Sequence, residues 1–271
     1  MKILASLVLF KHSLNDIEKT ISALVQEDSI STIVIVDNGG HCKWLDYFEH
    51  EKVKVIRVPV NHGFGAGHNI VFNKFRDKAD FILICNPDIY FQKGELDELY
   101  DFSCAEKIGL AIPKIIYPNG NNQYGCKLLP SPYQLFIRRF FSVLSSNVNK
   151  EYELHDADYN KVFFAPSLSG CFLLISKHAL NEVKGFDERF FMYMEDVDLS
   201  RRVCDTGLPV RYYPGSTIIH VAQAKSQKSL KFLIYHVFSA IRYFNKWGWL
   251  TDSKRIKLNS LCLSSLLNLK K

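Results

Sequence analysis

Three stretches of the sequence carry acidic side chains in positions that suit chemistry. Asp37 and Asp88 follow apolar runs in "VDNGG" and "ICNPD", and Asp196 lies in "FFMYMEDVDLSRR". A carboxylate behind a rigid proline suits a hard cation, because Mg²⁺ binds few protein carboxylates and completes its shell with phosphate oxygens and water. Asn86-Pro87-Asp88 is equally an ordinary turn sequence. The spacing alone leaves both interpretations open.

Two further strand-end residues have a functional and a structural interpretation. An acidic residue at the end of a second strand, as Asp37 is, often meets a ribose or a base edge, but an aspartate before Asn-Gly also favours a turn. His220 ends the apolar run "STIIH". A neutral imidazole is a good metal ligand, although a single histidine at a strand end is also common as a structural residue.

The acidic cluster of Glu195, Asp196 and Asp198 follows a long apolar and aromatic stretch. Carboxylates in apolar surroundings have raised pKa values, as a general base requires. Alternatively, acidic residues at a helix start are stabilised by the helix dipole, and Asp198 with Arg202 has the i, i+4 spacing of a helix ion pair.

The glycine-rich stretch "NHGFGAGHN" is a weak signal. Gly63, Gly65 and Gly67 complete neither G-x-x-x-x-G-K-[ST] nor G-x-G-x-x-G. Glycine here allows either close approach of the backbone to a ligand or a helix start.

The elements that must position these residues alternate along the first half of the chain. Apolar runs predict strands and 3.6-residue periodicity predicts helices. This alternation predicts a mostly parallel, Rossmann-like sheet flanked by helices, with ligands at the carboxyl ends of its strands. The predicted strands are 3–9, 30–36, 53–58 and 81–85, and the helices are 14–25, one within 61–75, and 94–105.

The second half is less regular. We expect short strands and a loop over 108–131, strand-like stretches over 162–175, and strands over 210–213 and 217–221. Helices are predicted over 132–144, 177–183, 195–206 and 227–247, and a polar loop over 147–160.

The composition, 47% hydrophobic and 23% charged, is that of an ordinary globular protein. The 271 residues fit one large domain or two small ones. The seven cysteines include no CxxC pair, which predicts reduced thiols in the cytosol. The apolar run at the N-terminus ends in Lys11 and His12 rather than at a small-residue cleavage site, so we expect a first strand and not a signal peptide.

The last 47 residues differ in charge from the rest. Residues 225–271 hold ten Lys or Arg and one acid, a net charge of +9, which leaves −3 for residues 1–224. We therefore expect a main domain over 1–224 and a basic, amphipathic helical extension over 225–271. Its aromatic residues suit an anionic membrane surface, or packing on the domain; nucleic acid is disfavoured because the charge is confined to the tail.

Six stretches occur in a characteristic order: "VDNGG", "NHGFGAGHN", "ICNPD", "GCFLLI", "GFDERFFMYMEDVDLSRR" and "IIH". In this order they resemble family 2 glycosyltransferases of the GT-A fold, and more narrowly the rhamnosyltransferase branch that builds bacterial O-antigen and lipopolysaccharide. The resemblance covers roughly residues 3–247, and its specific parts are NPD and GFDExFFxYxEDxDLxxR.

The resemblance implies an inverting, metal-dependent enzyme. It would move a sugar, with L-rhamnose from dTDP-rhamnose favoured, from a nucleotide-sugar donor to a hydroxyl of a lipid-linked saccharide. Asp196 matches the catalytic base, with Glu195 and Gly170 beside the acceptor. Asp88 and His220 match the positions that hold Mg²⁺ or Mn²⁺ against the diphosphate.

The resemblance also implies a set of donor contacts. Asp37 would contact the nucleoside, and Asn61, Gly63 and Asn69 would line the nucleotide-sugar pocket. Asn86 stands where the family's D-x-D metal motif has its first acid, so it is expected to bind ribose rather than metal. The first strand also departs from the family, since it ends "LFK" rather than Thr-Tyr-Asn.

Other interpretations stay open. Asn86 keeps a non-catalytic nucleotide-sugar-binding subunit possible, and a sugar nucleotidyltransferase would need a basic glycine-rich signature that "VLFKHSLND" lacks. UDP- and GDP-sugars remain alternative donors. We expect a cytoplasmic protein, with the tail as a means of peripheral attachment to the inner face of the membrane.

Overall fold

The computed structural model describes residues 2–140, 145–222 and 230–269. The strands are β1 (Ile3–Leu9), β2 (Ile30–Asn38), β3 (Val53–Val58), β4 (Phe81–Cys85), β5 (Ile89–Tyr90), β6 (Leu110–Ile116), β7 (Cys126–Lys127), β8 (Ser167–Leu168), β9 (Phe172–Ser176) and β10 (Val210–His220). The α-helices are α1 (Leu14–Val25), α2 (Phe64–Phe75), α3 (Glu95–Ala105), α4 (Pro132–Phe140), α5 (Ser145–Tyr152), α6 (Lys177–Val183), α7 (Glu195–Asp205), α8 (Leu230–Trp247) and α9 (Ser253–Leu269). Short 3₁₀ turns span Lys43–Asp46 and Arg76–Lys78.

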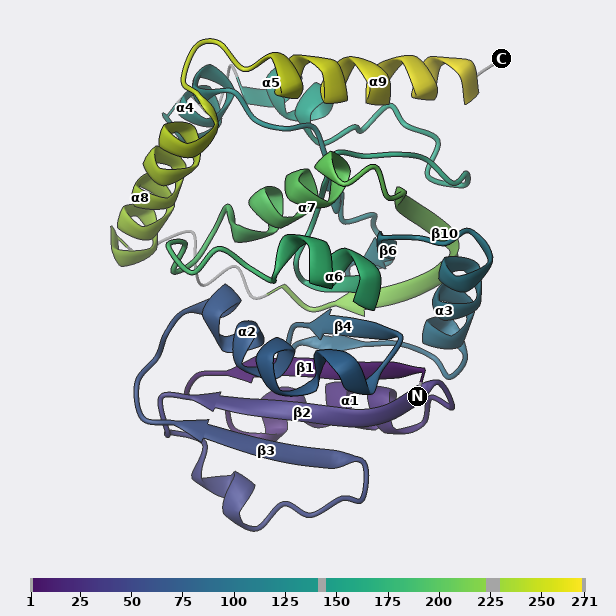
Figure 1. The fold of residues 1–271 in the computed structure, drawn as a ribbon, viewed down its shortest axis with the longest axis vertical. Helices are drawn as coiled ribbons and strands as arrows, with labels where there is room; N and C mark the ends of the chain where they lie inside the picture. The colour runs from purple at the N-terminus through teal and green to yellow at the C-terminus, as the bar shows by residue number, and fades with distance from the viewer. Residues whose placement is uncertain (1, 141–144, 223–229, 270–271) are drawn as a thin grey trace.

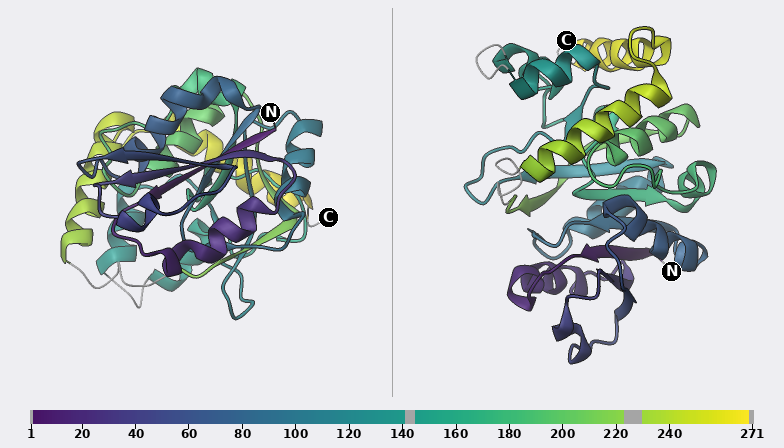
Figure 2. Two further views of the ribbon diagram at one scale, coloured as in Figure 1. Left: turned by 90° about the horizontal axis from the view of Figure 1, so that it is seen from below. Right: turned by 90° about the vertical axis from the view of Figure 1, so that its left-hand side faces the viewer.

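An eight-stranded sheet with the order β3-β2-β1-β4-β9-β6-β10-β5 forms the centre of the molecule (Figure 1). Six strands run in one direction, while β9 and β5 run antiparallel to their neighbours. Helices α1 and α2 lie on opposite faces of its first half (Figure 2). The mostly parallel sheet flanked by helices is therefore confirmed.

The central strands are continuous apolar runs because both faces of the sheet are covered. Every residue of β4 is buried, and so is every residue of β1 except Val8, which is half-buried. Ile17 and Leu24 of α1 and Val71 and Phe72 of α2 are buried in the same core. The apolar periodicity of the two helices thus fixes which face of each meets the sheet.

The fold differs from the prediction in three places, two of them in the second half of the chain. The expected loop over 147–160 begins as helix α5, whose last residue, Tyr152, is 4% exposed and whose carbonyl accepts a hydrogen bond from the Leu128 amide at 2.9 Å. The two strands expected over 210–221 are one strand, β10, with an irregularity between Tyr213 and Thr217. The two-residue strand β5 is too short to give a periodic signal.

Helices α8 and α9 pack on the part of the molecule that contains α7, far from β3 (Figures 1 and 2). Arg201 of α7 forms two hydrogen bonds of 2.6 Å to Asp252, and its guanidinium lies 4.0 Å from the ring centroid of Trp247. Tyr243 and Phe244 are buried beside them. The 1–224 and 225–271 division stays a prediction. Residues 141–144 and 227–229 of two predicted helices lie outside the described residues.

Within the described ranges, every helix is too short or too polar to cross a bilayer.

The Arg201–Asp252 pair gives a test of how strongly the tail is docked. We expect Asp252→Ala to lower the free energy of unfolding by about 3–5 kcal/mol, because it leaves a buried guanidinium without its counter-charge. Lys254→Ala is the matched control, since its 3.0 Å pair with Asp205 is largely exposed and should contribute under about 1 kcal/mol. Urea denaturation measures both; equal losses would contradict a tightly docked tail.

Candidate functional site

The first cavity, which we call the strand-end cavity, lies where β1, β2 and β4 end and α2 begins. Its volume is about 520 Å³. Ends of parallel strands are where open α/β sheets bind ligands. It is lined by Val8, Phe10, Lys11, His12, Asp16, Asn38, Asn61, Gly63, Phe64, Asn86, Pro87, Asp88 and Met192.

Asp88 lines this cavity and meets His220, which is not itself a lining residue, because β5 pairs with the end of β10. His220 is paired with Ile89 in the antiparallel register, and the Val221 amide donates to the Asp88 carbonyl at 3.0 Å. The imidazole Nε2 therefore lies 3.1 Å from Asp88 Oδ1. The pairing joins two residues that are 132 positions apart in the chain.

Burial disfavours the charged imidazole of His220, but the Asp88 carboxylate and the Cys171 thiol outweigh it and raise the pKa of His220 to about 10. The second ring nitrogen, Nδ1, lies 3.0 Å from Gln123 Oε1. In the structure the ring thus has an acceptor at each nitrogen.

The pair also fits a divalent cation once Nε2 of the imidazole has lost its proton, because only a neutral imidazole is a metal ligand. Among the described residues, no group of three His, Cys, Asp or Glu side chains gathers around one point. One carboxylate and one imidazole, Asp88 and His220, suit a cation that takes most of its ligands from phosphate oxygens and water.

The wall beside this pair is a rigid amide network. Asn38 Nδ2 donates to Asn61 Oδ1 at 3.0 Å and to the Gly63 carbonyl at 2.9 Å, and the Gly63 amide donates to Asn61 Oδ1 at 2.8 Å. Asn38 was not predicted as a site residue, and its only signal in the sequence is its place directly after Asp37.

The glycines of α2 allow close packing against a late segment of the chain. A Cβ on Gly63, whose φ is +92°, would lie 2.2 Å from the Phe191 carbonyl oxygen. A Cβ on Gly65 would lie 2.8 Å from Phe186 Cβ. The close approach expected from Gly63 and Gly65 is therefore to residues 185–191 of the protein itself, and that of Gly67 is to Val8.

Two of the predicted donor contacts lie elsewhere. Both Asp37 oxygens accept hydrogen bonds from backbone amides of the following turn, those of His41 and Cys42, at 3.1 Å. Asn69 binds the backbone of Phe186 through both ends of its amide, at 2.8 and 2.9 Å. Neither side chain lines the strand-end cavity. The hydrogen bonds of Asp37 and Asn69 instead hold backbone segments near the cavity.

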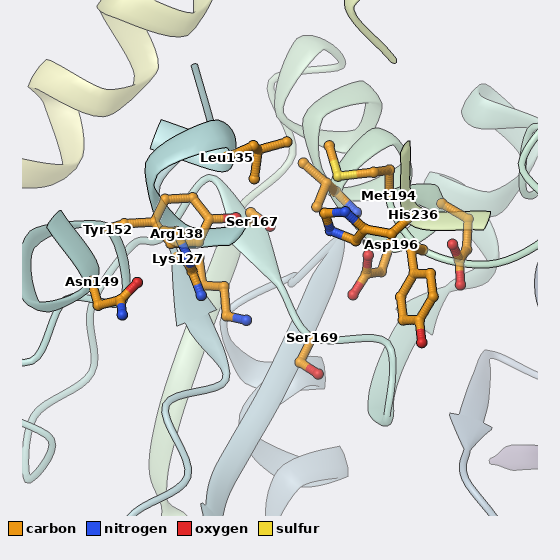
Figure 3. A pocket seen from close by; sticks show the side chains of 13 residues that line it. Lys127, Leu135, Arg138, Asn149, Tyr152, Ser167, Ser169, Met194, Asp196 and His236 are labelled. Atoms are coloured by element: carbon orange, nitrogen blue, oxygen red, sulfur yellow. Dashed lines mark hydrogen bonds between the residues drawn. The ribbon is translucent and has the colours of Figure 1, made fainter. Parts of the chain in front are cut away.

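The second cavity, which we call the α7 cavity, lies at the start of α7 and also measures about 520 Å³ (Figure 3). Tyr193 and Met194 precede the helix with φ values of 69° and 67°. Left-handed conformations of such residues are uncommon and gather at functional sites. The cavity is lined by Lys127, Leu135, Arg138, Asn149, Tyr152, Ser167, Ser169, Tyr193, Met194, Glu195, Asp196, Val197 and His236.

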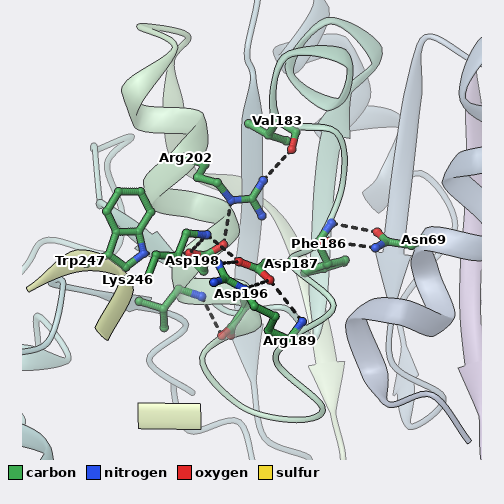
Figure 4. Close-up of polar contacts among 11 residues, drawn as sticks. Asn69, Val183, Phe186, Asp187, Arg189, Asp196, Asp198, Arg202, Lys246 and Trp247 are labelled. Carbon is green, nitrogen blue, oxygen red and sulfur yellow. Dashed lines mark hydrogen bonds and ion pairs between the residues drawn. The ribbon is translucent and has the colours of Figure 1, made fainter. Parts of the chain in front are cut away.

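Asp198 anchors the structure. Its side chain is fully buried and accepts hydrogen bonds from Arg202 Nε at 2.7 Å and Trp247 Nε1 at 2.8 Å (Figure 4). Lys246 Nζ adds an ion pair at 2.6 Å. The i, i+4 pair expected from the sequence is thus part of a larger network that holds α8 against α7.

Glu195 and Asp196 both line the α7 cavity, but their carboxyl groups have different surroundings. Burial, together with the charge of Asp196, raises the pKa of Glu195 well above its usual value, and Glu195 Oε2 has no hydrogen-bond partner among the described residues. Asp196 is half-buried, and its two oxygens accept from the amides of Gly170 at 3.0 Å and Val197 at 2.8 Å. Asp196 is therefore the oriented carboxylate that a ligand can reach.

The two cavities adjoin at residues 170–171. A Cβ on Gly170 would lie 3.1 Å from Asp196 Cβ and 3.5 Å from the ring of Phe64, which lines the strand-end cavity. The Cys171 carbonyl accepts from the Asn86 amide at 2.7 Å. The structure thus brings the two predicted acids to neighbouring cavities with a common boundary.

Lys127, Arg138 and Tyr152 were not found from the sequence. They come from β7, α4 and α5, and no motif links them. Only the fold shows that they face Asp196.

The family model described as glycosyl transferase family 2 matches residues 7–172, which is more than half of the chain. The chain belongs to glycosyl transferase family 2. This glycosyltransferase is 22% identical over 264 residues to rhamnosyltransferase WbbL of Escherichia coli K12, covering 94% of this chain and 98% of that one. It is 27% identical over 216 residues to the N-acetylglucosaminyl-diphospho-decaprenol L-rhamnosyltransferase of Mycobacterium tuberculosis, covering 73% of this chain and 68% of that one.

The fold of this family 2 glycosyltransferase is shared with solved structures. GalNAc-T7 with UDP, GalNAc and Mn²⁺ superposes with a TM-score of 0.66 at 14% identity, covering 91% of this chain. The chain spans 48% of the length of GalNAc-T7. TarS of S. aureus (residues 1–349) superposes with a TM-score of 0.59 at 15% identity, covering 97% of this chain and 71% of that one. The GT-A fold and the rhamnosyltransferase-like enzyme expected from the sequence are confirmed.

Proposed function

We propose that this enzyme transfers a sugar, with inversion, from a nucleoside diphosphate donor to a hydroxyl of a lipid-linked saccharide. The observation that carries the proposal is the common boundary at Gly170 between a cavity with the Asp88–His220 pair and a cavity with Asp196. L-Rhamnose from dTDP-rhamnose is the favoured donor because two relatives are named rhamnosyltransferases. Bacterial surface polysaccharide is the expected product.

The donor would occupy the strand-end cavity, with its diphosphate at Asp88 and His220. These two residues would hold Mg²⁺ or Mn²⁺, and the Mn²⁺ in the GalNAc-T7 structure supports a metal site in this fold. When bound, the cation stabilises negative charge on the departing diphosphate. Asn61 and Gly63 would contact the nucleotide sugar, with Asn86 nearest the ribose.

The acceptor would occupy the α7 cavity. Asp196 takes the proton of the acceptor hydroxyl as that oxygen bonds to the anomeric carbon, and the bond from this carbon to the diphosphate breaks. Asp198 is held in its ion network, and Glu195 is buried with a raised pKa. With a single available carboxylate, attack comes from the face opposite the leaving group, which gives inversion.

The described part of the tail supports attachment to a membrane. Helix α8 exposes apolar side chains at spacings of three and four residues. By contrast, two lysines of the tail form ion pairs within the protein: Lys246 with Asp198 and Lys254 with Asp205. We therefore place the apolar face of α8 against an anionic inner leaflet. This face consists of Leu230, Ile234, Val237, Phe238 and Ile241.

Asp196→Asn tests the base. We expect transfer to fall about 100-fold or more, because the amide cannot accept the proton, while the Kd for the nucleoside diphosphate changes less than about twofold. Asp205→Asn, at the far end of the same helix, is the matched control. Radiolabelled-sugar transfer and calorimetry measure the two quantities; near-normal turnover by Asp196→Asn would remove Asp196 from this role.

Asp88→Asn tests the cation. In the unaltered enzyme we expect Mn²⁺ to tighten nucleoside diphosphate binding about tenfold or more, because the cation links the carboxylate to phosphate oxygens. Asp88→Asn should abolish most of this gain, whereas the exposed Asp80→Asn should keep it. Titration calorimetry with and without Mn²⁺ decides; an undiminished metal effect in Asp88→Asn would rule out Asp88 as the ligand.

Flotation with vesicles tests the membrane surface. We expect the enzyme to float with vesicles rich in phosphatidylglycerol, and the double variant Ile234→Ser, Phe238→Ser to float at least about threefold less, because buried apolar area contributes to interfacial binding. Tyr47→Ser removes an aromatic residue that is 89% exposed at a distant site and serves as control. Equal flotation of all three proteins would argue against α8 as the attachment face.

A further inference from the structure

A basic wall faces Asp196 across the α7 cavity. Figure 3 shows Lys127 and Arg138 beside Tyr152 on one side of the cavity, with Asp196 and His236 on the other. The base proposed above needs nothing from this wall.

The wall carries more positive charge than its neighbours neutralise. Arg138 Nη2 lies 2.6 Å from Glu153 Oε1, whereas Lys127 Nζ lies 3.9 Å from the same oxygen, beyond hydrogen-bond distance. His155 Nε2 contacts the other oxygen at 3.1 Å. One carboxylate thus serves two permanent cations, so this wall, taken by itself, keeps a net positive charge.

The Arg138 guanidinium is held in place and still has an N–H donor without a partner among the described residues. Its centre lies 4.2 Å from the centroid of the Tyr152 ring, and its side chain is only 22% exposed. Arg138 Nη1 is a buried donor without a hydrogen-bond partner among the described residues. Unsatisfied buried donors are costly unless a ligand completes them. A fixed planar fork next to a lysine suits phosphate oxygens.

The apolar surroundings indicate what carries the phosphate. Helix α4, which supplies Arg138, exposes Tyr133 and Phe136 to 69% and 54%, and α8, which supplies His236, exposes its apolar face. Both helices contribute residues to the cavity lining. A ligand with its phosphate at the basic wall can therefore continue onto apolar surface.

We propose that Lys127 and Arg138 bind the phosphate or diphosphate through which the acceptor sugar is joined to its lipid. The inference rests on the proposed function, because it takes the α7 cavity as the acceptor site. A sugar held by this group places one of its hydroxyls toward Asp196 on the opposite wall. The wall thus selects acceptors that carry a phosphate.

Two synthetic acceptors separate recognition of the phosphate from recognition of the sugar. Both carry the same sugar and the same short alkyl chain, joined by a diphosphate in one and by a neutral ether in the other. Assays in neutral detergent without phospholipid ensure that no lipid headgroup supplies phosphate. The measured quantity is the ratio of kcat/KM for the diphosphate acceptor to kcat/KM for the neutral acceptor.

We expect this ratio to be about tenfold or more in the unaltered enzyme and to approach one in Lys127→Gln. Arg138→Lys keeps the charge beside Glu153 but removes the fork, so it should lower the ratio partially while the protein stays folded. Lys177→Gln is the matched control: its side chain is 39% exposed, against 32% for Lys127, and it has a single carboxylate partner at 3.1 Å. Thermal melts verify folding.

Equal use of the two acceptors by the unaltered enzyme, or a ratio that Lys127→Gln leaves unchanged, would overturn the inference alone. Transfer to neither acceptor would overturn the proposed function and this inference with it.

Discussion

The hydrogen bond from the Gly170 amide to the Asp196 carboxylate is the contact on which the site depends. It orients Asp196, the half-buried carboxylate of the α7 cavity, and Gly170 lacks the side chain that would crowd it. The carbonyl of the next residue, Cys171, accepts a hydrogen bond from the Asn86 amide and so holds the turn that carries Asp88. Two consecutive residues therefore set the positions of the proposed base and the proposed diphosphate site relative to each other.

Environment gives the three acids of one motif three different roles. Asp198 is neutralised by donors from α7 and α8 and ties the tail to the domain. Glu195 is buried and has a raised pKa. Asp196 is held by backbone amides at the cavity surface. Three carboxyl side chains within four positions thus differ because their partners come from distant segments.

Local patterns predicted much of the fold but only part of the site. The bounds of β1, α1, β3, β4 and α6 agree with the prediction because apolar runs and helical periodicity are local signals. The β5–β10 pairing that joins Asp88 to His220, and the gathering of Lys127 and Arg138, depend on contacts between distant segments that no short motif encodes. Asn69 was selected by motif position, yet its amide serves a backbone contact.

The most direct test is a crystal structure with Mn²⁺ and an unreactive nucleotide-sugar analogue. The account predicts anomalous density for Mn²⁺ between Asp88 and the diphosphate, with the anomeric carbon of the sugar at the boundary formed by Gly170 and its free face toward Asp196. A diphosphate bound away from the strand-end cavity, or a sugar directed away from Asp196, would contradict it.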